Sequence, residues 1–340
     1  MKAVVLVKTG DPRRAFQIQD LPEPVVAAHQ VSIDVDVFGL NFADVVARLG
    51  QYRDCPPLPT VIGYEVVGRV AEVGSEVYGL SKGQRVMAFT RFGGYARRVV
   101  TDARAVVPIS EDLDAGMATA LCVQYCTAYF AAEYITRLHA GEHVLVQSAA
   151  GGVGTALVQL AKLRGCVIYG TAGSEKKMDY LREQGVDYPI NYQKEDFAKY
   201  IAKKAPNGKV QVVFDAVGGS SVRKGLGILQ AGGRIVCYGA AVFSERGQNI
   251  FGTLKHALSF GIYHPAQLMM ASKSLMGVNM LRVADEQPLV LQHCLRAVAD
   301  LAMSGAVKPV VDTVFPIEQL PEAHEKLEFR GSIGKIAVKW

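Results

Sequence analysis

Paired cysteines are missing from this 340-residue sequence. Its six cysteines, at positions 55, 122, 126, 166, 237 and 294, form no C-x-x-C pair and keep no regular spacing. Several of them, such as Cys166 and Cys237, lie in apolar runs, where a free thiol behaves as a small hydrophobic group. We therefore expect a reduced, cytoplasmic protein with neither a disulfide framework nor a zinc ribbon.

Long runs of one residue type are missing as well. No apolar stretch approaches the roughly 20 residues that span a bilayer, and the first apolar run ends at Lys8, too early for a signal peptide. The net charge of +5 comes from 37 basic and 32 acidic residues with no concentrated basic stripe. These absences argue against an integral membrane segment and against nucleic-acid binding.

The residues that are present suggest about two domains. Half of them are hydrophobic and a fifth are charged, which is ordinary for globular proteins. Residues 1–105 are rich in valine, in period-2 alternation and in Gly/Pro turns, which predicts a β-rich, partly closed lobe. Strands are predicted at 2–7, 30–37, 66–73, 85–89 and 95–101. The stretch 61–74 as a whole is interpreted as a strand, a turn and a second strand.

From about residue 113 the pattern becomes helical, at 114–121 and 125–134, and then strands and helices alternate. The predicted strands are 143–147, 166–171, 187–191, 211–215 and 234–238, and the helices between them are 155–163, 175–183, 195–203 and 221–229. This alternation predicts a parallel sheet with helices on both faces. A strand at 274–280, a helix at 288–303 and strands near 310–314 and 335–339 follow. We expect this last part of the chain to rejoin the N-terminal lobe.

A glycine-rich turn joins strand 143–147 to the helix after it. Its sequence is G-x-G-x-x-G with Ala149 in place of the first glycine, and Gly151 and Gly154 as the second and third. The second glycine lets the backbone approach a pyrophosphate, the third lets the helix pack on the strand, and the helix N-terminus offers free N–H groups. Within a β-α-β unit this turn, including Gly152 and Val153, predicts a dinucleotide site. The alternative is a glycine-rich turn that merely packs.

The second strand of this unit lacks the carboxylate that holds the ribose of NAD about 20 residues after the turn. The small Gly173 stands near that position, Ser174 can donate a hydrogen bond, Lys177 can supply charge and Tyr192 can close the pocket. Hydroxyl donors and a lysine suit a 2′-phosphate, so the sequence favours NADPH. Glu175 weakens this prediction. The alternative is that Lys176 and Lys177 are ordinary surface lysines on an exposed helix.

With this turn placed after a β-rich lobe, the chain resembles the medium-chain dehydrogenase/reductase superfamily from end to end. The stretches GLNFADVVARLGQY at 39–52, PPLP at 56–59 and GYEVVG at 63–68 resemble its zinc-independent quinone oxidoreductase (zeta-crystallin) group. GLNFADVVARLGQY, together with GTAGSEKK at 170–177 and NIFGTLKHALSFGIYHPAQLMMASKSLMG at 249–277, also resembles the branch of the vesicle amine transport protein homologues. The resemblance implies an α/β protein with a GroES-like, partly closed β-barrel catalytic domain at 1–124 and 266–340, and a Rossmann NADPH-binding domain at 125–265.

The resemblance also implies site residues. Tyr52 would lie beside the nicotinamide as the catalytic hydrogen-bond or proton donor, although it could be only a lid aromatic. Asn41 would orient the carboxamide or an acceptor oxygen. The remaining cofactor contacts that the resemblance implies, besides the turn and the 2′-phosphate residues, are Thr127, Val217, Tyr238, Gly239, Asn279 and Arg330.

No metal is implied. Zinc alcohol dehydrogenases of this superfamily take ligands from a Cys, a His and a later Cys, and the matching positions here hold Asn41, Tyr64 and Val123. The adjacent Cys122 could supply only one of the three protein ligands that a catalytic zinc needs. Tyr64 is expected to be a space-filling, hydrogen-bonded core tyrosine and not a catalyst.

Two carboxylates near these positions, Asp44 and Glu65, are expected to be structural. Each would pair with an arginine such as Arg48 or Arg69, because buried carboxylates need such partners.

Without a Lewis acid, the resemblance and the turn imply hydride transfer from NADPH to an electron-poor small molecule, either a quinone or an α,β-unsaturated carbonyl. The alternative is an NADPH-binding adaptor or vesicle-associated protein with little turnover. Residues 250–276 are apolar and aromatic, so we expect them to form a pocket wall and a homodimer contact rather than a helix on a membrane.

Overall fold

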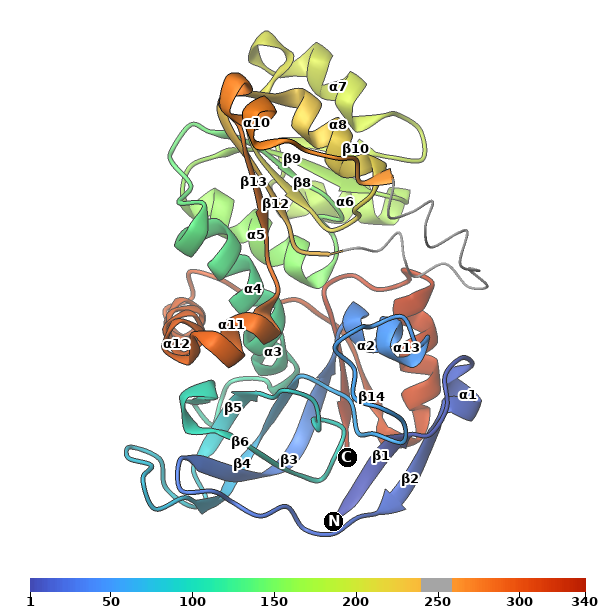
Figure 1. The fold of residues 1–340 in the computed structure, drawn as a ribbon, viewed down its shortest axis with the longest axis vertical. Coiled ribbons are helices and arrows are strands. Elements are labelled where there is room, and N and C mark those ends of the chain that lie inside the picture. Colours follow the sequence, from blue (N-terminus) through green and yellow to red (C-terminus); the bar gives the residue numbers. More distant parts are fainter. Residues whose placement is uncertain (240–258) are drawn as a thin grey trace. The chain divides into compact units, whose positions relative to one another are not determined.

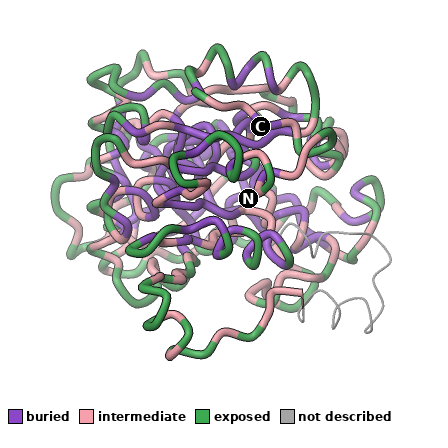
Figure 2. Tube along the Cα trace, turned by 90° about the horizontal axis from the view of Figure 1, so that it is seen from above, coloured by how far each residue is buried: buried purple, intermediate pink, exposed green. Residues whose placement is uncertain are grey.

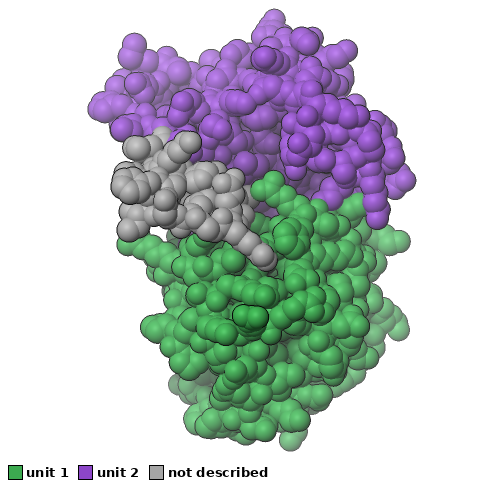
Figure 3. Space-filling model, turned by 90° about the vertical axis from the view of Figure 1, so that its right-hand side faces the viewer, with its two compact units in different colours: residues 1–126, 280–340 green, residues 127–279 purple. Residues whose placement is uncertain are grey.

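The computed structural model describes residues 1–239 and 259–340, which form two compact units (Figure 1). Unit 1 comprises Met1–Cys126 and Met280–Trp340, and unit 2 comprises Thr127–Asn279 (Figure 3). The expected boundary at residue 266 differs from this division, because strand β13 (Ser274–Gly277) pairs with β12 (Leu229–Cys237) in the sheet of unit 2.

Unit 2 contains a six-stranded parallel sheet. The strand order is β10 (Tyr188–Asn191), β9 (Val167–Ala172), β8 (His143–Val146), β11 (Val210–Asp215), β12 and β13. Helices α5 (Gly152–Leu163), α6 (Glu175–Glu183), α7 (Phe197–Lys204) and α8 (Ser220–Ile228) connect the strands. This is the doubly wound order in which the first strand lies beside the fourth, and ligands bind at that reversal, beyond the carboxyl ends of β8 and β11.

Local chemistry accounts for these elements. Strand β8 is apolar on both faces, with Val144, Leu145 and Val146 completely buried, as expected for a parallel sheet covered by helices. Ser174 caps α6 by accepting a hydrogen bond from the N–H of Lys177. The buried stretches lie mainly along the strands, and turns and outer helix faces are exposed (Figure 2).

Unit 1 contains a seven-stranded mixed sheet and a separate antiparallel pair, β1 (Lys2–Leu6) with β2 (Phe16–Asp20). The order of the large sheet is β14 (Val311–Pro316), β15 (Lys335–Lys339), β3 (Gln30–Leu40), β4 (Glu65–Val73), β5 (Arg85–Phe89) and β7 (Val106–Pro108), and β6 (Arg98–Asp102) also pairs with β3. Ile336 of β15 lies opposite Leu40 of β3. The C-terminal strands therefore rejoin the N-terminal lobe, as predicted.

The strand predicted at 66–73 is observed as β4, from Glu65 to Val73, whereas the interpretation of 61–74 as two strands joined by a turn is wrong. Gly68 lies inside this strand, where a Cβ would overlap the carbonyl of Asp34. The pairing of β3 with β4 shifts register between Val35 and Val37. The glycine therefore marks a bulge with close backbone contact and not a reversal of the chain.

The predicted helices at 114–121 and 125–134 are observed as α3 (Ala115–Ala120) and α4 (Cys126–Tyr129) with π-helical turns at Leu121–Tyr125 and Phe130–Ile135. Asp114 caps α3 by accepting from the N–H of Met117 at 2.8 Å. The other α-helices of residues 1–239 and 259–340 are α1 (Pro12–Ala15), α2 (Phe42–Arg48), α10 (Pro265–Ala271), α11 (Met280–Glu286), α12 (Pro288–Met303) and α13 (Leu320–Glu328).

The six cysteines are free thiols. Within residues 1–239 and 259–340, no helix is both long and apolar enough to cross a membrane. Of the segment 250–276, residues 250–258 lie outside the described residues, and the part after them exposes Ile262, Met269 and Met270.

Candidate cofactor site and active site

The glycine-rich turn of unit 2 has the shape of a phosphate cradle. Helix α5 begins at Gly152, with Gly151 as its N-cap, and no side chain caps its first N–H groups. A Cβ at Gly154 would overlap the carbonyl oxygen of Ser148 and lie 2.7 Å from the Cα of Ala149. Only glycine allows the helix to start this close to β8, so the free amides of the first turn remain available to an anion.

A buried chain of hydrogen bonds beneath the cradle was missed by sequence reasoning. The hydroxyl of Thr171 accepts from the N–H of Ser148 at 3.0 Å and donates to the Gln147 Oε1 at 2.9 Å. The Gln147 Nε2 donates to the Ser221 hydroxyl at 3.0 Å, and this hydroxyl donates to the Asp215 Oδ2 at 2.5 Å. The sequence signal that could have predicted these hydrogen bonds is the polar residue at the carboxyl end of each apolar strand. These hydrogen bonds connect the carboxyl ends of β8, β9 and β11.

Asp215 also brings predicted cofactor residues together at the same end of the sheet. Its Oδ1 accepts from the N–H of Val217 at 2.9 Å, and its backbone carbonyl accepts from the N–H of Tyr238 at 3.0 Å. A Cβ on Gly239 would lie 2.7 Å from the carbonyl oxygen of Ala216, so the backbones after β11 and β12 run close together there.

The residues predicted to surround a 2′-phosphate lie together at the end of β9. The Tyr192 phenol occupies the space that a Cβ on Gly173 would need. The Glu175 Oε1 accepts from the Asn191 Nδ2 at 2.9 Å and pairs with the Lys194 Nζ at 2.8 Å. The hydrogen bonds from Lys194 and Asn191 lower the pKa of Glu175. Its charge is thus offset by partners of its own.

In unit 1, Asn41 lies between three ionisable side chains, those of Asp44, Glu65 and Lys335. It is the N-cap of α2, and its backbone N–H donates to the Asp44 Oδ2 at 2.7 Å. Its Nδ2 donates to the Glu65 Oε1 at 2.8 Å, and its Oδ1 accepts from the Lys335 Nζ at 3.2 Å. Lys335 also donates to the Leu40 carbonyl at 2.9 Å and forms an ion pair with Glu65. Lys335 and Glu65 are completely buried.

The expected arginine partners for the two carboxylates are therefore wrong. Burial raises the pKa of Glu65, and its partner Lys335 opposes that shift. The two candidate arginines bind elsewhere. Arg48 pairs with Glu328 at 2.6 Å and Arg69 pairs with Glu111 at 2.7 Å.

Asp44 is completely buried, and burial raises its pKa to about 8. The Asn41 N–H and the charge of Lys335 oppose this shift. Near neutral pH the carboxyl group is therefore largely protonated.

Aromatic side chains surround the predicted catalytic tyrosine. The ring of Tyr52 lies 6.1 Å from Tyr64 in an edge-on contact and 6.5 Å from Phe92, and Tyr64 lies 5.2 Å from Phe92. Tyr64 is 3% exposed, as expected for a core tyrosine, but its hydroxyl has no hydrogen-bond partner among the described residues, so the expected hydrogen bond is not observed. Burial raises the pKa of Tyr52 to about 12 and that of Tyr64 further. Both phenols are therefore neutral hydrogen-bond donors at physiological pH.

The three other predicted cofactor residues divide between the units. Thr127 and Asn279 belong to unit 2, and Arg330 belongs to unit 1. Arg330 is exposed after α13 with a φ of 57°. Their contacts with the cofactor stay predictions.

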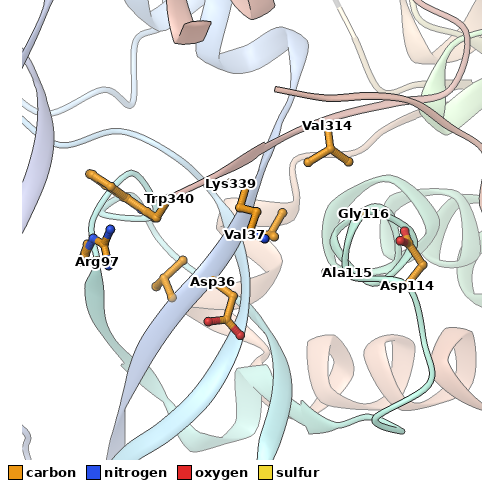
Figure 4. Close-up of a pocket in the computed structure, with 10 residues that line it drawn as sticks. Asp36, Val37, Arg97, Asp114, Ala115, Gly116, Val314, Lys339 and Trp340 are labelled. Carbon is orange, nitrogen blue, oxygen red and sulfur yellow. The ribbon is translucent and has the colours of Figure 1, made fainter. Parts of the chain in front are cut away.

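A pocket of about 450 Å³ opens elsewhere in unit 1 (Figure 4). Its charged residues are of both signs, Asp36 and Asp114 with Arg97 and Lys339, and Trp340 forms part of its wall. None of the predicted site residues lines it.

The donor set at the expected metal positions does not fit zinc. Both ends of the Asn41 amide are taken by Glu65 and Lys335. The neighbouring Cys122 could supply only one of the three protein ligands that a catalytic zinc needs. In the part of the chain that the structure describes, no group of three or more His, Cys, Asp or Glu side chains could hold a metal ion.

Comparison with known proteins agrees with this architecture. Residues 27–111 match the family model of the alcohol dehydrogenase GroES-like domain, and residues 184–338 match that of the zinc-binding dehydrogenases. The human synaptic vesicle membrane protein VAT-1 homologue is 34% identical over 331 residues, which cover 97% of this chain and 84% of the human protein. Rat quinone oxidoreductase is 30% identical over 340 residues, covering 99% of this chain and 97% of the rat protein.

The matches cover the relatives unequally. The chain spans 65% of the length of the zebrafish VAT-1 homologue, with 33% identity over 318 residues. Among solved structures, that of Escherichia coli quinone oxidoreductase complexed with NADPH has a TM-score of 0.86 at 25% identity and covers 100% of both chains.

A GroES-like unit combined with a doubly wound parallel sheet defines a medium-chain dehydrogenase/reductase, and the chain belongs to that oxidoreductase superfamily. Its relatives there are the quinone oxidoreductases and the VAT-1 homologues. The fold class and the resemblance stated from the sequence are therefore confirmed.

Proposed function

We propose that the protein is a zinc-independent, NADPH-dependent reductase of quinones or α,β-unsaturated carbonyls. The proposal depends on which residues occupy the two positions that match metal ligands in zinc enzymes, and on the contacts that these residues make. Asn41 is hydrogen-bonded at both ends of its amide, and Tyr64 packs in an aromatic cluster. Such a site can donate hydrogen bonds but supplies no Lewis acid, so it suits an acceptor that is already electron-poor.

Two features of unit 2 and one comparison support NADPH as the cofactor. The uncapped first turn of α5 suits a pyrophosphate. Lys177 and Tyr192 flank the position where a NAD site carries a carboxylate, and Glu175 is offset by Lys194. The chain also resembles a quinone oxidoreductase whose structure was solved with NADPH.

When bound, NADPH supplies the hydride. The protein positions the acceptor and stabilises the negative charge that develops on its oxygen. Tyr52 donates its phenolic O–H to that oxygen, and the raised pKa of about 12 keeps the proton on the phenol at neutral pH. The second N–H of the Asn41 amide is left for the nicotinamide carboxamide or the acceptor.

A steady-state assay of NADPH oxidation with 1,2-quinones, 1,4-quinones and small enones tests the proposal. We expect turnover with at least one of these acceptors by protein that contains no stoichiometric zinc. Tight NADPH binding without turnover on any acceptor would instead support an adaptor, the role suggested by likeness to a synaptic vesicle membrane protein. Sedimentation of the same preparation tests the proposed homodimer.

Replacing Tyr52 by phenylalanine should lower kcat/KM for the acceptor by about 100-fold, because the developing oxyanion loses a donor in a partly desolvated site. NADPH affinity should change by less than about threefold, because phenylalanine keeps the aromatic ring at this position. Tyr78→Phe, at a tyrosine that is 90% exposed, is the control. An unchanged kcat/KM in Tyr52→Phe would make this residue a packing aromatic only.

Replacing Lys177 by alanine should weaken NADPH binding by about tenfold through loss of one charged contact to the 2′-phosphate. Binding of NADH, which lacks this phosphate, should stay the same. Lys176→Ala removes the same charge from the neighbouring exposed position and serves as the matched control. Fluorescence titration with NADPH and with NADH measures both affinities. Equal losses of affinity for the two nucleotides would contradict the assignment of Lys177 to the 2′-phosphate.

A further inference from the structure

We infer that Glu65 and Lys335 are positioning residues that hold the Asn41 side-chain amide in one of its two orientations. The Nδ2 faces Glu65 and the Oδ1 faces Lys335. One N–H of the Asn41 amide then remains for a ligand. The inference rests on the proposed function, because it gives Asn41 a role toward the cofactor or acceptor.

Strand order brings the three side chains together. Strand β3 lies between β15 and β4, and Gly39, near its end, stands opposite Ala337 of β15. A Cβ on Gly39 would overlap the Glu65 Oε1 and lie 2.5 Å from the Lys335 Cε. The absent side chain therefore lets the carboxylate and the ammonium group meet across β3, directly beside Asn41.

Opposite charges distinguish the two ends of the amide. An ammonium group can only donate, and a carboxylate can only accept. Turning the Asn41 amide by 180° would place its NH₂ against Lys335 and its carbonyl oxygen against Glu65, and both contacts would be repulsive. An apolar wall would leave the two orientations nearly equal. A buried ion pair is costly to desolvate, and selecting one orientation gives this pair a function beyond stability.

The central variant is Glu65→Gln combined with Lys335→Met. It removes both charges, keeps the side-chain volumes similar and leaves no unpaired buried charge. The matched control is Arg69→Met with Glu111→Gln, which removes an exposed ion pair from the same unit. Gly39→Ala is a second test that keeps both charges and displaces the pair, with Gly227→Ala as its control because a Cβ there meets no atom within 4 Å.

The first measurement is hydrogen exchange of the Asn41 side-chain NH₂ by NMR of protein labelled with [¹⁵N]asparagine, assigned through Asn41→Ala. We expect slow exchange in the wild type and exchange at least about tenfold faster in Glu65→Gln/Lys335→Met and in Gly39→Ala, as hydrogen-bond protection is lost. Exchange in the wild type as fast as that of exposed asparagines would overturn the inference, whether or not any variant folds.

The second measurement is a mutant cycle on kcat. Glu65→Gln/Lys335→Met should lower kcat by about the same factor as Asn41→Ala, and combining all three changes should add nothing further, because the pair acts through Asn41. If the pair had a purely structural role, the factors by which the two sets of changes lower kcat would multiply in the combined variant. That result would overturn the inference. If the wild type turns over no acceptor, the proposed function fails, and the exchange experiment alone decides on the positioning role.

Discussion

Replacing Gly154 by alanine is expected to abolish measurable NADPH binding. The added methyl group would overlap the carbonyl oxygen of Ser148 and lie 2.7 Å from the Cα of Ala149. These are backbone atoms of the cradle, so the start of α5 must move away from β8 and its amides leave the pyrophosphate position. A loss of at least about 100-fold in affinity, close to 2.7 kcal/mol, should result.

Isothermal titration with NADPH checks this result. Gly227→Ala is the control, because it adds the same methyl group to an exposed position of α8 with open space around it. There alanine should leave binding unchanged and stabilise the helix by up to about 1 kcal/mol. A dissociation constant for Gly154→Ala within about threefold of the wild type would contradict the cradle.

The second large effect is expected for Asp44→Asn, as a change in how stability depends on pH. Asp44 has a pKa of about 8 in the folded protein and an ordinary value of 3.8. Between these values the unfolded chain releases the proton and the folded protein keeps it. The free energy of unfolding therefore falls as pH rises, by up to about 1.4 kcal/mol per pH unit from this group, and levels off above its folded pKa.

Asparagine cannot ionise, so Asp44→Asn should remove this decline. The free energy of unfolding of the variant, relative to that of the wild type, should rise steadily from pH 5 to pH 8, and the difference should reach several kcal/mol. Urea unfolding at each pH, followed by the fluorescence of the single tryptophan, Trp340, reports on unit 1. Asp20→Asn, which removes an exposed carboxylate, is the control. A difference between wild type and Asp44→Asn that does not change with pH would refute the prediction.

The doubly wound unit could be predicted from sequence because its signals are local. The bounds of α6 and α12 match their predictions, Glu175–Glu183 and Pro288–Met303, since a capping Ser174 and an initial proline mark their starts. The glycine-rich turn was recognised in the same way. The start of α5 was placed three residues too late, because its first turn contains the glycines of the cradle itself.

The centre of unit 1 could not be predicted in this way. Glu65 and Lys335 are 270 residues apart in sequence, and only the strand order β15–β3–β4 brings them together. Arginines close in sequence therefore seemed the natural partners of the buried carboxylates. The raised pKa of Asp44 was equally hidden, because it results from burial that no local pattern reveals.

The late position of Lys335 also bears on synthesis at the ribosome. Unit 2 is one continuous segment, so it can begin to fold as soon as it emerges, whereas the sheet of unit 1 lacks β14 and β15 until the C-terminal residues follow. Until then Glu65 has no ammonium partner. In a nascent chain the proposed nucleotide site should therefore form before the proposed active site is complete.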